Sequence, residues 1–180
     1  MGIFHDPRIT VMLSQSEIAS RVAALGEEIT KTYQDDAADL VLVGILKGSV
    51  IFLADLARAI DLPLKTDFIG LSSYGDATTS SGVVRLTSDL SKPIDGKNVL
   101  IVEDIVDTGL TMRYLLENLA TRAPKSVRLC ALLEKPTKNT SGVKVDFLGF
   151  SVPDKFVIGY GLDYGEKYRN LPFVGVFEGG

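Results

Sequence analysis

Three predominantly apolar runs constrain the fold more than any other feature of the chain. The runs at 40–45, 99–102 and 127–133 are rich in Val, Ile and Leu, without the polar alternation of a strand that has one face in water. After the first two, residues 49–60 and the apolar positions from Met112 to Leu119 repeat with helical spacing. Buried strands that alternate with helices predict an α/β protein with an open, mostly parallel twisted sheet flanked by helices.

Further elements are expected around these runs. Ser14 and Glu17 have the spacing of a capping box, so a helix should begin there and run to about Tyr33. Residues 72–81 form a long polar loop, which we expect to be disordered or a mobile lid. Shorter or flanking strands are expected at the following positions: 64–71, 82–88, 145–150, 156–160 and 172–177.

Composition bounds the class of protein. A length of 180 residues predicts a single domain over 1–180, and 46% hydrophobic residues are enough for a sizeable core. The net charge of −4, with no basic run, argues against a nucleic-acid partner. The lone Cys130 and the lone His5 exclude a disulfide framework and a His- or Cys-based metal cluster, and we assign a core position to Cys130. Because no signal peptide or membrane-length apolar segment is found, we expect a soluble, cytoplasmic protein with no membrane partner.

Residues 99–111 carry the most chemistry. The apolar run ends in two carboxylates, Glu103 and Asp104, and a third, Asp107, leads into a turn at 108–111 that opens a helix. A glycine-containing turn at a helix N-terminus presents free N–H groups and a partial positive charge, which suit a phosphate group. The paired acids could accept hydrogen bonds from a diol or hold a hard cation. Acids favoured by the helix dipole alone would explain one or two of these carboxylates, but not three within five positions.

This segment resembles the phosphoribosyl-diphosphate signature of the type I phosphoribosyltransferases. Residues 46–48, 72–75 and 153–164 resemble further motifs of the 6-oxopurine branch of that family, in the expected order. The resemblance implies the family fold, with a small hood made by the N- and C-terminal segments. It also implies a purine salvage enzyme that transfers the 5-phosphoribosyl group from 5-phosphoribosyl 1-diphosphate to hypoxanthine or guanine. The products would be IMP or GMP and pyrophosphate, and Mg²⁺ would be the cofactor.

The resemblance further implies a role for each matching residue. Asp107 matches the general base, Lys135 the purine 6-oxo contact, Phe156 the stacking aromatic, and Val157 a backbone contact to the purine edge. Family members often have a non-proline cis peptide just before the residue that matches Lys47. The remaining matches comprise the diphosphate contacts, the lid tip, the metal and ribose carboxylates, and the 5′-phosphate loop: Lys47, Gly48, Arg169; Ser73, Tyr74; Glu103, Asp104, Asp163; and Thr108, Gly109, Leu110, Thr111.

Some alternatives stay open. Leu110 stands where several family members have lysine, so the phosphate loop would have one cation fewer. A xanthine-preferring enzyme, or a regulator that binds nucleotide or RNA on the same fold, would share most of these motifs. The resemblance suggests a homodimer or homotetramer, and the apolar run at 173–177 could be core or interface.

Overall fold

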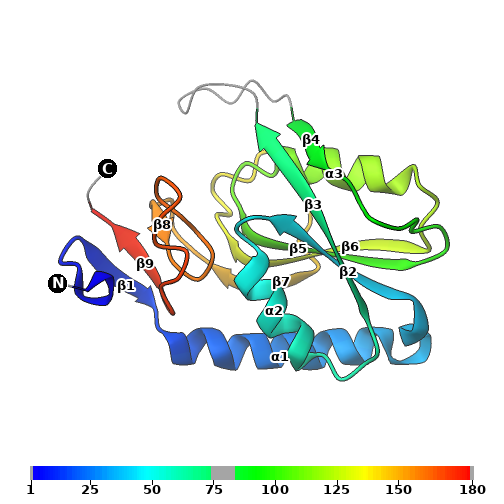
Figure 1. Ribbon diagram of the computed structural model, residues 1–180, viewed down its shortest axis with the longest axis horizontal. Coiled ribbons are helices and arrows are strands. Elements are labelled where there is room, and N and C mark those ends of the chain that lie inside the picture. Colours follow the sequence, from blue (N-terminus) through cyan, green and yellow to red (C-terminus); the bar gives the residue numbers. More distant parts are fainter. Residues whose placement is uncertain (1, 74–83, 179–180) are drawn as a thin grey trace.

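The computed structural model describes residues 2–73 and 84–178, and its centre is a six-stranded sheet in the order β4-β3-β2-β5-β6-β7 (Figure 1). All neighbouring strands are parallel except the edge strand β4, which pairs antiparallel with β3. The predicted open, mostly parallel α/β sheet is therefore confirmed. The strands are β2 (Leu40–Leu46), β3 (Lys65–Ser73), β4 (Val84–Ser88), β5 (Asn98–Val106), β6 (Ser126–Glu134) and β7 (Phe147–Ser151).

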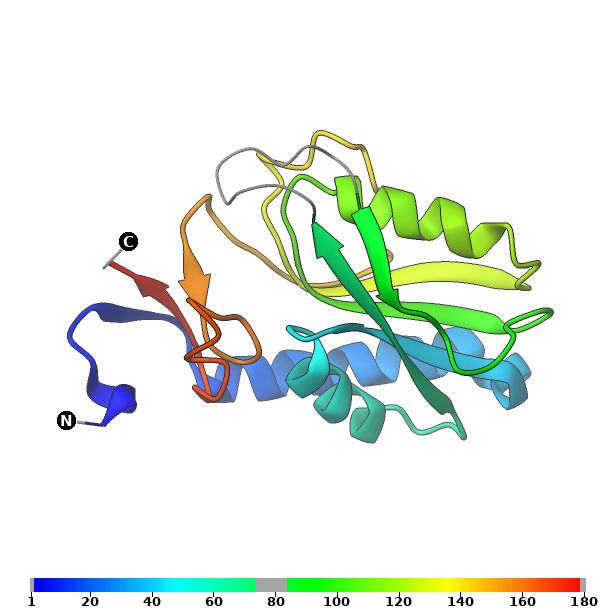
Figure 2. The ribbon, with the colours of Figure 1, turned by 45° about the horizontal axis from the view of Figure 1, so that its top comes forward.

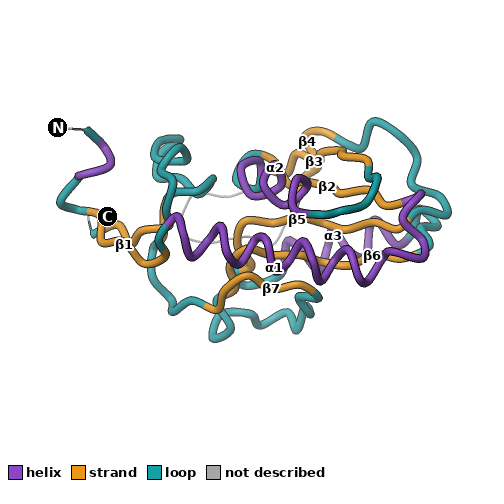
Figure 3. Tube along the Cα trace, turned by 90° about the horizontal axis from the view of Figure 1, so that it is seen from below, coloured by secondary structure: helices purple, strands orange, loops and turns teal. Residues whose placement is uncertain are grey.

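Helices cover both faces of this sheet (Figures 1 and 3). Helices α1 (Gln15–Tyr33) and α2 (Val50–Ala59) pack on Leu42, Leu100 and Leu132. Helix α3 (Leu110–Ala120) packs on the alternate strand residues, such as Val43 and Ile101. Because successive side chains of a strand point to opposite faces, the uninterrupted apolar runs supply both cores.

A second, smaller sheet forms the hood beside the large one (Figure 2). It joins β1 (Ile9–Leu13), β9 (Val174–Phe177) and β8 (Val157–Ile158) in antiparallel order β1-β9-β8. The strand β1 was not expected from the sequence. Val174 and Phe177 are buried within the chain, so the apolar run near the C-terminus contributes to the core.

Local signals explain several boundaries. Ser14 and Glu17 form the predicted capping box: the Ser14 N–H donates to Glu17 Oε2 at 2.8 Å and the Glu17 N–H donates to Ser14 Oγ at 3.3 Å. Cys130 is fully buried in β6, as expected. Two short 3-10 helices, at Ile3–His5 and Gln34–Asp39, were not predicted.

Several strands differ from their expected bounds, β5 and β8 the most. Strand β5 continues to Val106 instead of ending at 102, because its pairing with β6 continues through Glu103 and Ile105. Strand β8 is shorter than the expected 156–160, because Gly159 and Tyr160 have positive φ and turn the chain.

In the described part of the chain, no helix has both the length and the apolarity needed to span a bilayer.

Candidate active site

The predicted site residues gather where β2, β5 and β6 end, at the carboxyl edge of the large sheet. Lys47 follows β2, Asp107 follows β5 and Lys135 follows β6, and these strands are adjacent. The site therefore lies at the edge where ligands bind in open parallel sheets. Ser72 and Ser73, which we expected in the loop, are the last two residues of β3, so that part of the expectation was wrong, whereas Tyr74 and the remainder of the expected lid lie outside the described residues.

The loop after β5 forms an open helix N-terminus. Gly109 is the N-cap of α3 with φ of 77° and has no side chain to cap the helix, in contrast to the capping box of α1. The Leu110 N–H donates a long hydrogen bond, 3.4 Å, to Thr108 Oγ1. The Thr108 carbonyl accepts a hydrogen bond from the Ser141 N–H at 3.2 Å, which ties this loop to the segment that follows β6. A Cβ atom at position 109 would lie 2.2 Å from Ser141 Oγ and would have to displace it, and the positive φ also favours glycine there. Apart from the Leu110 N–H, the N–H groups of the first turn have no side-chain partner among the described residues and are available for an anion.

Glu103 and Asp104 are carboxylates inside a strand and not beyond its end. Glu103 Oε2 is buried and has no hydrogen-bond partner among the described residues. Burial, with the neighbouring Asp104 charge, raises the pKa of Glu103 well above its ordinary value. Burial likewise raises the pKa of Asp104 to about 6, although the Ile105 N–H donates to its carboxylate at 2.8 Å. Two adjacent acids whose pKa values are raised by burial, one of them with an unpartnered oxygen, are typical of a functional site.

A second group of residues lies beside Asp104 on the hood side. The Leu46–Lys47 peptide is cis, as the resemblance suggested, and Lys47 Nζ donates to Glu166 Oε2 at 2.7 Å. Arg169 Nη2 lies 2.8 Å from Asp163 Oδ1 and 3.3 Å from Glu166 Oε1. Lys47 and Arg169, from opposite ends of the sequence, therefore share one carboxylate, Glu166. Two cations this close form a place for a polyanion once Glu166 moves aside.

Close backbone approach brings this group together. A Cβ atom on Gly48 would fall 1.7 Å from Asp104 Oδ2, and one on Gly161 would fall 2.0 Å from the Gly48 carbonyl oxygen. Both positions therefore require glycine. The β2–α2 loop, the strand β5 and the hood loop meet at these two residues.

Lys135 and Asp107 meet on the other side of the site. Lys135 is buried, and its Nζ donates to Asp107 Oδ2 at 3.4 Å and to Asp154 Oδ1 at 3.3 Å. The Lys135 N–H also donates to the Val106 carbonyl at 3.0 Å, which ties the two strand ends together. A buried ammonium between two carboxylates is a fixed donor aimed into the site.

An aromatic side chain stands near this pair on the hood. Phe156 is 52% exposed, an unusual position for phenylalanine, and meets Tyr164 edge-to-face with ring centroids 5.7 Å apart. Val157 follows in β8 and is buried. The free face of Phe156 is suited to stacking on a planar ring.

Sequence reasoning missed several residues that the structure places at the site. Asp154 lies within the 153–164 motif but was given no role, yet it pairs with both Lys135 and Lys138. Glu166 bridges the two predicted cations, and Ser141 supports the phosphate loop. The position of Asp154 two residues before Phe156 was a usable sequence signal. The contacts of Glu166 and Ser141 arise only from tertiary packing.

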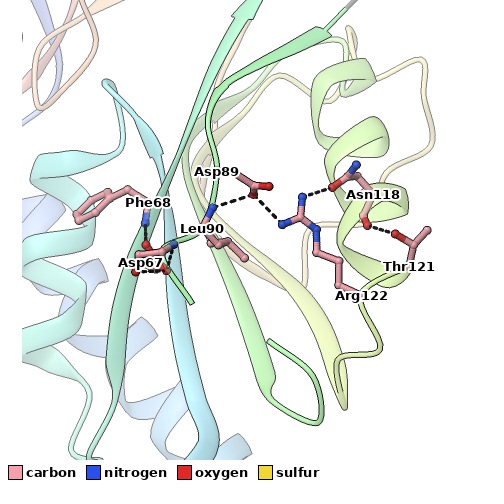
Figure 4. Close-up of polar contacts among 8 residues, drawn as sticks. Asp67, Phe68, Asp89, Leu90, Asn118, Thr121 and Arg122 are labelled. Carbon is pink, nitrogen blue, oxygen red and sulfur yellow. Dashed lines mark hydrogen bonds and ion pairs between the residues drawn. The ribbon is translucent and has the colours of Figure 1, made fainter. Parts of the chain in front are cut away.

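A hollow of about 530 Å³ lies at the opposite end of the sheet, where β2 and β3 begin. Asp67 accepts from the Ser91 N–H and hydroxyl at 2.8 and 2.9 Å, while Asp89 accepts from the Leu90 N–H and Arg122 Nη1 at 2.7 Å each (Figure 4). These contacts fix the connection between β4 and β5. Because none of the predicted site residues lines this hollow, we do not assign it to the active site.

Known proteins are similar to this chain in sequence and in fold. Residues 12–165 match the family model described as a phosphoribosyl transferase domain. The hypoxanthine-guanine phosphoribosyltransferase of Mycobacterium avium is 51% identical over 94% of this chain and 85% of its own length. A crystal structure of a hypoxanthine phosphoribosyltransferase from Staphylococcus aureus superposes with a TM-score of 0.92 at 41% identity, covering 98% of this chain and 95% of that one. The Trypanosoma cruzi enzyme in complex with the product IMP gives 0.89 at 38% identity, with 96% of each chain covered.

The chain therefore belongs to the phosphoribosyltransferases, the class that its sheet, hood and phosphate loop define. Within that class it belongs with the hypoxanthine and hypoxanthine-guanine phosphoribosyltransferases. The family resemblance drawn from the motifs is confirmed, and membership of a transferase family favours an enzyme over a non-catalytic regulator.

Proposed function

We propose that the protein transfers the 5-phosphoribosyl group from 5-phosphoribosyl 1-diphosphate to hypoxanthine or guanine, forming IMP or GMP and pyrophosphate. The observation that carries this proposal is the meeting of Asp107 and the buried Lys135 beside an uncapped helix N-terminus. These three parts match the three needs of the reaction. A purine proton must be managed, an oxo group recognised and a phosphate held.

The phosphates bind at two separate places in this proposal. The N–H groups of 108–111 take the ribose 5′-phosphate, with the hydroxyls of Thr108 and Thr111 as further donors. Leu110 is exposed at the first position of α3, and its backbone contributes there without a side-chain cation. Lys47 and Arg169 take the diphosphate, and Gly48 lets it approach the backbone closely.

The purine lies between Phe156 and the end of β6. Lys135 donates to the 6-oxo group, and because an ammonium cannot accept a hydrogen bond, it disfavours the amino group of adenine. Asp107 acts as the general base and interacts with N7, in which case its contact with Lys135 loosens as the base enters. The backbone of Val157 contacts the purine edge, and this contact bears on the choice among hypoxanthine, guanine and xanthine.

The carboxylates fit a magnesium ion that arrives with the substrate. In the described residues, no three His, Cys, Asp or Glu side chains converge as a preformed metal site. Instead, Asp104 lies against Gly48 and Asp163 pairs with Arg169 on the diphosphate side, and Glu103, next to Asp104 in β5, has a buried oxygen with no partner among the described residues. Such a donor set suits Mg²⁺, which keeps several waters and is commonly held by one or two carboxylates plus phosphates. The ion would neutralise charge on the leaving diphosphate, while Glu103 and Asp104 would also face the ribose hydroxyls.

Assembly and compartment follow from the same proposal. We infer a homodimer or homotetramer from the family resemblance. Phosphorylated sugars do not cross membranes unaided, so an enzyme that uses one in salvage belongs in the cytoplasm.

The experiment that tests the catalytic role is Asp107→Asn. The amide keeps the shape but cannot act as a base, so kcat should fall by about 10²- to 10⁴-fold while the KM for 5-phosphoribosyl diphosphate changes little. Glu117→Gln, which neutralises an exposed acid on the far side of α3, is the control and should be neutral. An Asp107→Asn enzyme with wild-type kcat would contradict the role of Asp107.

A further inference from the structure

The turn that carries Gly161 has an unusual residue at its corner. The Gly159 N–H donates to the Leu162 carbonyl at 2.9 Å, and the Leu162 N–H donates back at 3.1 Å. The two central residues, Tyr160 and Gly161, have φ of 49° and 108°. Turns of this kind favour Gly or Asn at the first central position, because residues other than Gly, Asn and Asp rarely adopt positive φ. A tyrosine held in this conformation indicates that its side chain has a function there.

The Tyr160 side chain reaches helix α2. The ring is buried, and the hydroxyl donates to Asp55 Oδ2 at 2.5 Å. Burial and the Asp55 charge raise the pKa of Tyr160, so the hydroxyl remains a donor at physiological pH. Asp55 also pairs with the exposed Arg58 through its other oxygen. The hydrogen bond therefore joins the hood turn to α2, the helix that directly follows Lys47 and Gly48.

The next residue of the turn holds Arg169. The Gly161 N–H donates to the Arg169 carbonyl at 2.9 Å, and Arg169 Nη1 donates to the Gly161 carbonyl at 2.7 Å. Gly161 also lies directly against the Gly48 carbonyl. A shift of the turn would therefore move the Arg169 guanidinium relative to Lys47 and Gly48. Neither Tyr160 nor Asp55 needs to touch a substrate to have this effect.

We propose that Tyr160 and Asp55 are positioning residues that set the spacing between Arg169 and the Lys47–Gly48 loop, and so set the affinity for the diphosphate end of the substrate. This inference rests on the proposed function, because it assumes that these two cations bind diphosphate. Nothing in the pair's contacts reaches Lys135 or Phe156, so binding of the purine should not depend on it. The proposal therefore predicts a split between the two substrates.

The test compares Tyr160→Phe, Asp55→Ala and the double variant in the full-length protein. With hypoxanthine as the base, each single variant should raise the KM for 5-phosphoribosyl diphosphate by about five-fold and leave the KM for hypoxanthine within about two-fold. The double variant should be no worse than either single one, because both remove the same hydrogen bond. Calorimetric titration with magnesium pyrophosphate should show the same weakening without any turnover.

Two variants serve as matched controls. Tyr33→Phe removes a buried hydroxyl that has no partner among the described residues, and Arg58→Gln removes the other partner of Asp55. Both should bind pyrophosphate as the wild type does.

Distinct outcomes would contradict the two proposals. If Tyr160→Phe binds pyrophosphate as tightly as the wild type, or if its KM values for both substrates rise equally, the positioning role is wrong. The proposed function would remain intact. A wild-type protein that neither binds magnesium pyrophosphate nor forms nucleotide would overturn the proposed function, and this inference with it.

Discussion

The carboxyl group of Asp104 lies in surroundings that disfavour its charged form. Its pKa is raised from 3.8 to about 6 by burial, so the folded chain binds a proton more readily than the unfolded chain does. Asp104 therefore contributes to the stability of the folded state at low pH, and this contribution is lost as the pH rises from about 4 through 6. Above pH 7 the loss amounts to about 3 kcal/mol. In the proposed function, this unfavourable burial is explained by the need for a carboxylate on the ribose and metal side of the site.

Asp104→Asn removes this charge, and its effect on stability should depend on pH. The variant should be more stable than the wild type by about 1–3 kcal/mol at pH 8 and nearly equal to it at pH 4, while losing most activity. Urea unfolding at the two pH values measures the difference. Glu117→Gln, at an exposed position, should leave the pH dependence unchanged. Equal stability of Asp104→Asn and wild type at pH 8 would show that the charge is not disfavoured in the folded state.

Lys135 should determine the preference for oxopurines. Lys135→Ala removes a charged donor and leaves Asp107 and Asp154 without their shared partner, so kcat/KM for hypoxanthine should fall by about 10- to 100-fold relative to that for adenine. Competition between the two bases measures this ratio. Lys144→Ala, which removes an exposed lysine paired with Asp146, should keep the wild-type ratio. Unaltered discrimination in Lys135→Ala would refute the role of the lysine.

At the scale of elements, the N-terminus of α3 depends on the backbone of Gly109. Alanine there would be destabilised both by the positive φ and by the contact of its Cβ atom 2.2 Å from Ser141 Oγ. Gly96 has φ of 66° with open space around it, at the other end of the sheet, so Gly96→Ala isolates the first of these costs. We expect about 1 kcal/mol of destabilisation for Gly96→Ala with normal activity, and more for Gly109→Ala with at least a ten-fold higher KM for 5-phosphoribosyl diphosphate. Thermal unfolding and steady-state kinetics on both variants test this, and equal kinetics would contradict the proposed phosphate loop.

Sequence predicts the elements of the large sheet well, because their signals are local. The apolar runs of β2, β5 and β6 and the capping box before α1 each carry their own periodicity or spacing. The hood is harder to predict: β1 gains its identity as a strand only by pairing with β9, more than 150 residues away. The same limit applies to the site. Motifs predict Asp107 and Lys135, but Glu166 and the Tyr160–Asp55 pair become visible only when distant segments meet.

At the scale of the whole molecule, the proposed substrate is highly negative although the chain itself is acidic, so it must be bound by positive groups gathered locally in the site. With a net charge of −4, it has no field to attract long polyanions. In the proposed site, a helix N-terminus, two cations and magnesium held by carboxylates bind one small polyanion. The acidic residues are therefore partly the metal-binding component of the site.

The most direct test of this account is product formation from four bases. The protein is incubated with 5-phosphoribosyl diphosphate and Mg²⁺, together with hypoxanthine, guanine, xanthine or adenine in separate reactions, and nucleotides are separated by chromatography. We predict IMP and GMP from the first two bases, with pyrophosphate released in equal amount, and little or no AMP. If neither hypoxanthine nor guanine yields a nucleotide, the central claim is wrong.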